Sequence, residues 1–178
     1  MRGRSCHASC VLSAGLGKDI GLEMVGADTE LDRQVLYLVK DPLTHLVRNW
    51  ADHGIENPDE RSAAGKSRRG TIRLTASRQG GYVVIEIADD GRGLDTARIK
   101  AKALEAGLIG ESEISAKSQA EINNLIFAPG FSTALEVTSI SGRGVGMDIV
   151  RSNIEQIGGT VDVKSFPGSG TSFVIKFR

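Results

Sequence analysis

Residues 41–54 read DPLTHLVRNWADHG and have the residue spacing of an amphipathic helix from 42 to 53. Asp41 suits its N-cap and Gly54 its C-cap, with Pro42 at the first helical position. One stripe is apolar and predicts packing on a sheet: Leu43, Leu46, Val47, Trp50 and Ala51. The opposite stripe is polar: His45, Arg48, Asn49, Asp52 and His53. A solvated surface is one interpretation of this stripe. Exposed helices favour Lys and Glu, however, so two histidines and an asparagine indicate a functional face.

Strand and helix patterns alternate along the rest of the chain. The expected strands cover 19–25, 72–76, 82–88, 161–163 and 173–177. The expected helices cover 31–39, 95–107, 118–126 and 144–157, with Asp95 as an N-cap and Ser118 and Glu121 as a capping box. Two loops are expected, a solvated one at 55–69 that contains Lys66, Arg68 and Arg69, and a long one at 127–143. The pattern predicts an α+β fold with helices on one face of a mixed, mainly antiparallel sheet.

A second polar motif, Asp89-Asp90-Gly91-Arg92-Gly93-Leu94, directly follows an expected strand. An acidic residue at a strand end can direct its carboxylate inward while a Gly-x-Gly turn bends the backbone. Such a carboxylate can accept a hydrogen bond from an amine like that of adenine. An ordinary Asp-Gly turn is the alternative interpretation.

A glycine-rich motif, Ser141-Gly142-Arg143-Gly144-Val145-Gly146-Met147, leads into the helix expected from 144. Its alternate glycines expose backbone N–H groups at a helix N-terminus, which is the mechanism of a phosphate cradle. No βαβ unit precedes the motif and no Gly-Lys-Ser/Thr follows it, which argues against a dinucleotide fold and a Walker A loop. A shorter motif, Gly168-Ser169-Gly170-Thr171, is by itself only a turn.

Composition and charge narrow the function classes. The 22 Lys and Arg residues balance 22 Asp and Glu residues, which argues against general binding to nucleic acid or to an anionic membrane surface. No apolar run approaches the roughly 20 residues of a membrane span. Cys6, His7 and Cys10 offer three metal ligands without a fourth, so we expect residues 1–18 to be a partly ordered lead-in or a terminal remnant with reduced thiols. The unusual count is 22 glycines against 4% aromatic residues.

The order of these motifs resembles the N, G1, F, G2 and G3 boxes of the Bergerat-fold (GHKL) ATP-binding family. The boxes correspond to His45-x-x-x-Asn49, Asp89-x-Gly91-x-Gly93, Phe127, Gly142-x-Gly144-x-Gly146 and Gly168-x-Gly170-Thr171. Within that family, GADTELDR, DPLTHLVRNWADHGIE, DDGRGLD, FAPGFST and SGRGVGMDIV are similar to the catalytic domain of CheA-type chemotaxis histidine kinases. The resemblance covers residues 19–178 and implies a Bergerat-type two-layer α/β sandwich. Trp50 departs from it, because a smaller residue is usual there.

The resemblance implies a role for each matching residue. His45 stands where ATP-hydrolysing relatives carry the glutamate that activates water, and it is expected to orient groups or handle a proton near the γ-phosphate. Asn49 is expected to bind Mg²⁺, for which an amide oxygen is a suitable ligand. Arg48, His53 and Lys102 are expected near the phosphates, and Asp89 at the adenine. The other expected nucleotide contacts are Gly91, Gly93, Phe127, Gly142, Gly144, Val145, Gly146 and Thr171, with residues 127–143 as an ATP lid.

The resemblance also implies a function. We expect a cytoplasmic catalytic domain that binds ATP with Mg²⁺ and donates the γ-phosphoryl group to a histidine of a separate domain, because His7, His45 and His53 offer no acceptor within the chain. The implied partners are this phosphoacceptor domain, the dimerisation and receptor-coupling domains of the full kinase, and a response regulator. Nucleic acid and membrane insertion are not expected, and the isolated chain is expected to be a monomer. An ATP hydrolase and a non-catalytic nucleotide-binding module are the alternatives.

Overall fold

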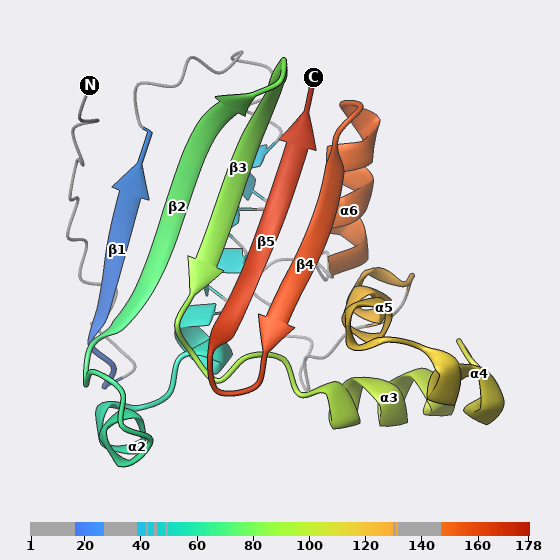
Figure 1. Ribbon diagram of the computed structural model, residues 1–178, viewed down its shortest axis with the longest axis horizontal. Coiled ribbons are helices and arrows are strands. Elements are labelled where there is room, and N and C mark those ends of the chain that lie inside the picture. The colour runs from blue at the N-terminus through green and yellow to red at the C-terminus, as the bar shows by residue number, and fades with distance from the viewer. Residues whose placement is uncertain are drawn as a thin grey trace.

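A five-stranded sheet in the order β1-β2-β3-β5-β4 carries the fold (Figure 1). The computed structural model describes residues 17–26, 39–41, 43–44, 46–48, 50–129, 131 and 147–178. The strands are β1 (Ile20–Val25), β2 (Gly70–Gln79), β3 (Tyr82–Asp89), β4 (Thr160–Phe166) and β5 (Gly170–Phe177). β1 runs parallel to β2, and the other neighbouring pairs are antiparallel. The expected mixed, mainly antiparallel sheet is therefore confirmed.

Alternating burial shows why the last two strands form a half-buried hairpin. Along β4, Val161 and Val163 are buried while the residues between them are exposed. Their register partners on β5, Ile175 and Phe173, are buried too. Because side chains on a strand point alternately to opposite faces, this register places one apolar face toward the core.

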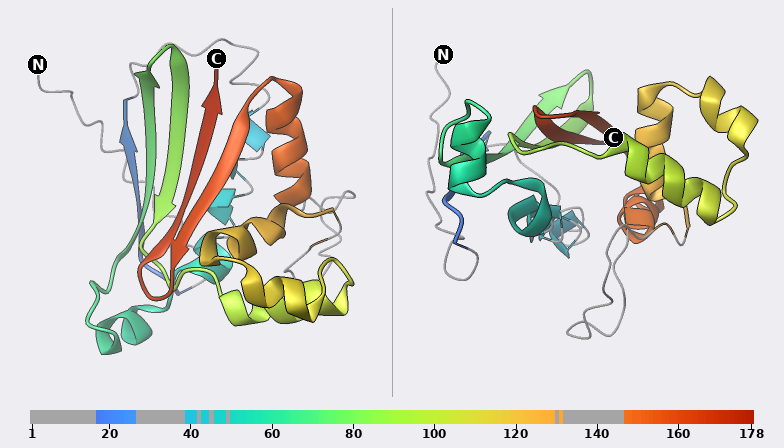
Figure 2. Two further views of the ribbon diagram at one scale, coloured as in Figure 1. Left: turned by 45° about the vertical axis from the view of Figure 1, so that its right-hand side comes forward. Right: turned by 90° about the horizontal axis from the view of Figure 1, so that it is seen from below.

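Helices lie over that apolar face of the sheet and around its margins. They comprise helical residues at 39–41, 43–44 and 46–48, followed by η1 (Trp50–Gly54), α2 (Pro58–Ala63), α3 (Thr96–Glu105), α4 (Glu111–Ala116), α5 (Gln119–Asn124), η2 (Leu125–Phe127) and α6 (Met147–Gln156). Figure 2 shows the 39–54 segment and α6 together on one side of the sheet, with α3 to α5 beyond its β4 edge. Two layers result, as expected from the sequence. Within the described ranges, no helix has the length and apolarity to cross a membrane.

The predicted helix caps after β3 are confirmed. The Asp95 carboxylate accepts a hydrogen bond from the Arg98 N–H at 3.0 Å at the start of α3. Ser118 and Glu121 form a reciprocal capping box at the start of α5. These caps rest on residues only three apart in the sequence, which is why the local pattern predicts them correctly.

Three local predictions are wrong. Residues 55–69 are not simply a solvated loop, because Asn57 and Glu60 cap the helix α2 and Arg61 within it is buried. The helix α4 was not expected. Asp41 is already helical rather than an N-cap, and Gly54 ends its helix without the positive φ of an αL cap. Residues 31–38 of the helix expected at 31–39, and most of the 127–143 loop, lie outside the described residues.

Candidate functional site

Asp89, the last residue of β3, is the buried acid of the site. Its side chain is 8% exposed. One carboxylate oxygen accepts a hydrogen bond from the Gly91 N–H at 2.7 Å and the other accepts from the Thr171 N–H at 3.2 Å. Burial raises the pKa of the Asp89 carboxyl to about 6, although the two hydrogen bonds lower it. The charges of Asp90 and Glu56 add to the rise. A carboxylate has about four lone-pair positions, so Asp89 can still accept from a ligand amine.

Close backbone approaches bring three motifs together at Asp89. A Cβ on Gly91 would lie 2.2 Å from the carbonyl oxygen of Gly54, at the end of the 39–54 helical segment. A Cβ on Gly170, which has φ +96°, would lie 2.0 Å from the carbonyl oxygen of Asp89. Only glycine allows such contacts without displacing the backbone. The end of the 39–54 helical segment, the turn after Asp89 and the start of β5 therefore meet.

Polar side chains extend from Asp89 across the sheet to β4. Thr171 and Ser165 are register partners on β5 and β4, both are buried, and their hydroxyl oxygens lie 3.0 Å apart. The Ser165 hydroxyl accepts from the Leu94 N–H at 2.8 Å. This places the predicted Thr171 beside Asp89 and adds Ser165, which the sequence analysis did not single out. The Ser165 hydrogen bonds therefore connect the chain after Gly93 to the β4–β5 hairpin.

The 39–54 helical segment ends in a π-helical turn, η1. The Ile55 N–H donates to the Trp50 carbonyl at 2.9 Å, five residues back. Trp50 itself is 6% exposed and packs against Phe173 of β5, with ring centroids 5.5 Å apart. The tryptophan that departs from the family pattern is thus accommodated in the core, at a wider turn of a kind often found near functional sites.

Lys18 caps this π-helical turn from outside the helix. Its ammonium donates to the carbonyl oxygens of Ala51 and Asp52 at 2.9 and 2.7 Å. Partial burial and the charge of Arg92 lower the pKa of Lys18. A cation at a helix C-terminus satisfies carbonyls that lack partners within the helix. Lys18 therefore connects the chain just before β1 to η1.

Replacing Lys18 with methionine is expected to loosen η1. The variant lacks both donors, so the unfolding free energy should fall by about 1 kcal/mol. The Ile55 amide, bonded to Trp50, should exchange its hydrogen faster with solvent. Hydrogen exchange followed by NMR measures this, and Lys164→Met, at an exposed position on β4, is the control. Unchanged exchange at Ile55 in the Lys18 variant would show that the contact does not support the turn.

The other predicted residues divide into four groups. Arg48 and His53 are exposed on the helical segment, where a ligand can reach them. Lys102 of α3 is half-buried, with its ammonium 5.8 Å from the Phe131 ring centroid. Phe127 is 3% exposed and its ring meets Phe173 edge-on at 5.8 Å, so it contributes to the core beside α6. His45, Asn49, Gly142, Gly144, Val145 and Gly146 lie outside the described residues.

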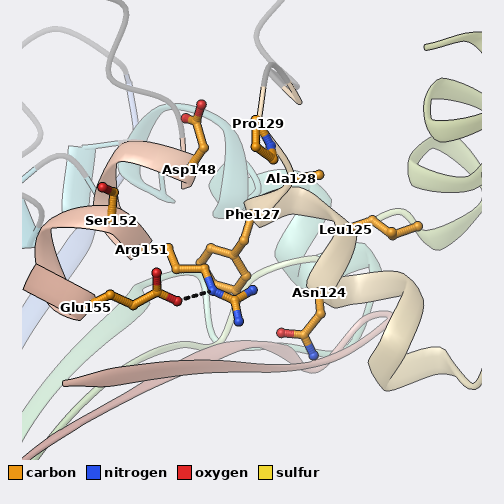
Figure 3. A pocket seen from close by; sticks show the side chains of 9 residues that line it. All are labelled: Asn124, Leu125, Phe127, Ala128, Pro129, Asp148, Arg151, Ser152 and Glu155. Atoms are coloured by element: carbon orange, nitrogen blue, oxygen red, sulfur yellow. Dashed lines mark hydrogen bonds and ion pairs between the residues drawn. The ribbon is translucent and has the colours of Figure 1, made fainter. Parts of the chain in front are cut away.

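A cavity of about 420 Å³ lies between η2 and the start of α6 (Figure 3). Figure 3 shows the Arg151 guanidinium beside the Phe127 ring and paired with Glu155 at 2.9 Å. The lining residues are Asn124, Leu125, Phe127, Ala128, Pro129, Asp148, Arg151, Ser152 and Glu155. Asp89 and Thr171 are not among them, so this cavity is separate from the buried acid.

Residues 39–178 match the family described as histidine kinase-, DNA gyrase B- and HSP90-like ATPases, and the chain belongs to this family. The ATP-binding fold implied by the resemblance is therefore confirmed. The chain is also 50% identical to the chemotaxis protein CheA of Salmonella typhimurium over 164 residues, 92% of its own length. It is 49% identical to CheA of Bacillus subtilis and 47% identical to the sensor histidine kinase CheAY of Helicobacter pylori, each over 93% of the chain. The expected similarity to a CheA-type catalytic domain is confirmed.

The chain spans only part of these relatives, namely 24%, 25% and 20% of their respective lengths. Among solved structures, the catalytic domain of histidine kinase ThkA has a TM-score of 0.50 and 22% identity. That match covers 90% of this chain and 78% of the other. It supports the α+β architecture.

The residues that support the 89–93 turn were not among those predicted from the sequence. Arg61 and Lys66 bond to Glu56 and to this turn, yet their segment was interpreted as solvated. One signal was present: Asn57, Pro58 and Glu60 have the spacing of a helix N-terminus with a capping box. No comparable signal marks Ser165, because only the strand register brings it to Thr171.

Proposed function

We propose that this chain binds ATP with Mg²⁺ and donates the γ-phosphoryl group to a histidine of a separate domain, as the ATP-binding part of a chemotaxis-type histidine kinase. The observation that carries the proposal is the buried Asp89, held by the Gly91 and Thr171 N–H groups where the end of the 39–54 helical segment meets the G1 and G3 boxes. The similarity to CheA and CheAY supports the kinase class.

The base end of the proposed site follows from Asp89. Its ionised carboxylate accepts a hydrogen bond from the exocyclic amine of adenine, while the oxygen of guanine at the same position offers no donor. Gly91 keeps the space beside this carboxylate free, because a Cβ added at this position would lie 2.7 Å from the Asp89 carboxylate oxygen. The geometry therefore suits adenine better than guanine.

The phosphate end is proposed from the sequence. Arg48, His53 and Lys102 would neutralise phosphate charge, and the backbone N–H groups of 142–146 would enclose the chain of phosphates. Mg²⁺ fits the side-chain oxygen of Asn49 together with phosphate oxygens, and it would supply charge neutralisation. Among the described residues, no group of three His, Cys, Asp or Glu side chains forms an alternative metal site.

The reaction would proceed by in-line displacement. An imidazole nitrogen of the acceptor attacks the γ-phosphorus, the bond to the bridging oxygen breaks, and ADP leaves with that electron pair. Phosphoryl transfer depends mainly on positioning and charge stabilisation, which this residue set can supply. His45, in place of a water-activating glutamate, would orient the reactants or handle the proton released by the acceptor.

A phosphotransfer assay tests the proposal. The chain is mixed with Mg²⁺-ATP labelled at the γ-phosphate and with a separate acceptor-histidine domain of a CheA relative. We expect label on the acceptor, none when its histidine is replaced by glutamine, and little phosphate release without acceptor. Steady release without acceptor would indicate a hydrolase. ATP binding without any transfer would indicate a non-catalytic module.

A further inference from the structure

Segment 56–66 contains an ionic cluster of the buried Arg61 and the partly buried Glu56 and Lys66, which we call the 56–66 cluster. Arg61 is 1% exposed. Its guanidinium donates to one Glu56 carboxylate oxygen at 3.1 Å, and the Lys66 ammonium donates to the other at 2.8 Å. Arg61 also donates to the carbonyl oxygen of Ser67 at 2.6 Å. Although burial opposes it, the Lys66 hydrogen bond holds the pKa of Glu56 below its ordinary value.

The two cations of the cluster also bind the turn after Asp89. Arg61 donates to the Asp90 carboxylate at 2.9 Å and to the Asp90 carbonyl at 3.2 Å. Lys66 donates to the carbonyl oxygens of Asp90 and Gly91 at 3.0 and 2.8 Å. The second oxygen of Asp90 accepts from the Thr71 N–H at 2.9 Å. The residues next to Asp89 are therefore held by side chains from a distant segment.

The charges in this region balance in pairs. Two anions, Glu56 and Asp90, meet two cations, Arg61 and Lys66. Asp89 stands beside them as an additional anion, and the charges of Asp90 and Glu56 raise its pKa. Losing one cation therefore leaves a net negative charge beside Asp89, and losing Glu56 leaves a net positive one.

The other elements packed around Asp89 offer different groups. β5 and β4 contribute the neutral side chains of Thr171 and Ser165. The cations Arg92 and Lys18 lie near η1, where the Arg92 N–H donates to the Gly54 carbonyl and Lys18 donates to the Ala51 and Asp52 carbonyls. Asp52 and His53 are the titratable side chains of η1. These groups stay unchanged when the cluster is mutated.

We propose that Glu56, Arg61 and Lys66 are positioning residues for the nucleotide. They fix the turn that follows Asp89 and, by neutralising Asp90 and one another, keep the Asp89 carboxylate ionised and able to accept from the base amine. This inference rests on the proposed ATP-binding function. It gives a role to a buried ion network whose net contribution to folding stability is expected to be small, because desolvation offsets ion pairing.

A pH dependence of binding follows from this arrangement. The base amine needs the ionised carboxylate, so ATP affinity should be full above the pKa of Asp89, about 6, and should fall tenfold per pH unit below it. Removing a cation and removing an anion from the cluster should move this fall in ATP affinity at low pH in opposite directions. Lys66→Met should shift it to higher pH, and Glu56→Gln to lower pH, each by about 0.5 to 1 unit.

The experiment measures ATP affinity by calorimetry from pH 5 to 8 for wild type, Lys66→Met and Glu56→Gln. Comparison at each pH cancels the titration of the nucleotide itself. Lys66→Arg should restore much of the wild-type profile because it keeps the charge. Arg68→Met is the matched control, since Arg68 pairs only with the exposed Asp59 in the described contacts of this segment. Carbon-13 NMR of the Asp89 carboxyl, without nucleotide, should show the same shifts.

The inference would be overturned by equal losses of affinity at every pH, or by pH shifts in one direction for both variants. Either result would mean that the cluster only stabilises the fold. That outcome would leave the proposed function intact if wild type binds ATP. Absence of ATP binding by wild type would overturn the proposed function instead. The NMR titration would then still decide whether the cluster controls the ionisation of Asp89.

Discussion

Asp89→Asn is expected to weaken ATP binding by about 10- to 150-fold while leaving the protein folded. The variant loses a charge-assisted hydrogen bond to the base amine, which contributes about 1.5–3 kcal/mol. The asparagine amide also has a single acceptor oxygen for two N–H donors, those of Gly91 and Thr171. Its NH₂ group must therefore face one of these two donors. Calorimetry with Mg²⁺-ATP measures the effect. Wild-type affinity in this variant would remove Asp89 from the nucleotide site.

The stability of the same variant relative to wild type is expected to rise with pH when no nucleotide is bound. Because the pKa of Asp89 is raised from 3.8 to about 6 on folding, its favourable contribution is complete below pH 4 and is lost as pH rises through 6. The asparagine does not titrate. The unfolding free energy of the variant relative to wild type should therefore increase by about 1 kcal/mol between pH 5 and pH 8. Urea unfolding at both pH values tests this sign, and a decrease would contradict it.

Gly91→Ala is expected to damage both the site and the fold. The new Cβ would lie 2.2 Å from the Gly54 carbonyl oxygen and 2.7 Å from the Asp89 carboxylate. Relief requires the Gly54 carbonyl to move, which breaks its 2.9 Å bond with the Arg92 N–H. We expect the unfolding free energy to fall by about 2–3 kcal/mol, as overpacking does elsewhere, and ATP affinity to fall at least about tenfold.

Gly110→Ala provides the matched control for this substitution. Gly110 also precedes a helix, has φ −85°, and has no atom within 4 Å of an added Cβ. Its unfolding free energy should stay within about 0.5 kcal/mol of wild type. Thermal unfolding and calorimetry of both variants separate the two cases. Equal behaviour would mean that the close approach at Gly91 relaxes freely and does not limit the site.

Local patterns predicted much of the fold correctly. The strands of both hairpins follow from residues that alternate over a few positions, as in β4 and β5. The caps at Asp95 and Ser118 depend on residues three apart. The turn at Asp89–Gly93 was also identified, because acid and glycines are adjacent in the chain. These features are determined by neighbours in the sequence, and so the sequence is sufficient to find them.

The π-helical turn at Trp50 could not be predicted from local sequence patterns. The apolar spacing of 42–53 predicted a regular helix up to Gly54. The structure widens the last turn, where Trp50 packs on Phe173 of β5 and Lys18 binds the free carbonyls. Both partners come from distant parts of the chain, so no local period contains them.

The sequence alone determined the family, the α+β class, the acid at position 89 and the glycines that surround it. Only the tertiary structure decided that Arg61 and Lys66, in a segment that seemed solvated, are bound to the turn after Asp89. It also decided that Ser165 meets Thr171 across β4 and β5. The physical reason is that a charged side chain is buried or exposed according to the partners it finds. Here those partners, Glu56 and Asp90, are assembled only when α2 packs beside the end of β3.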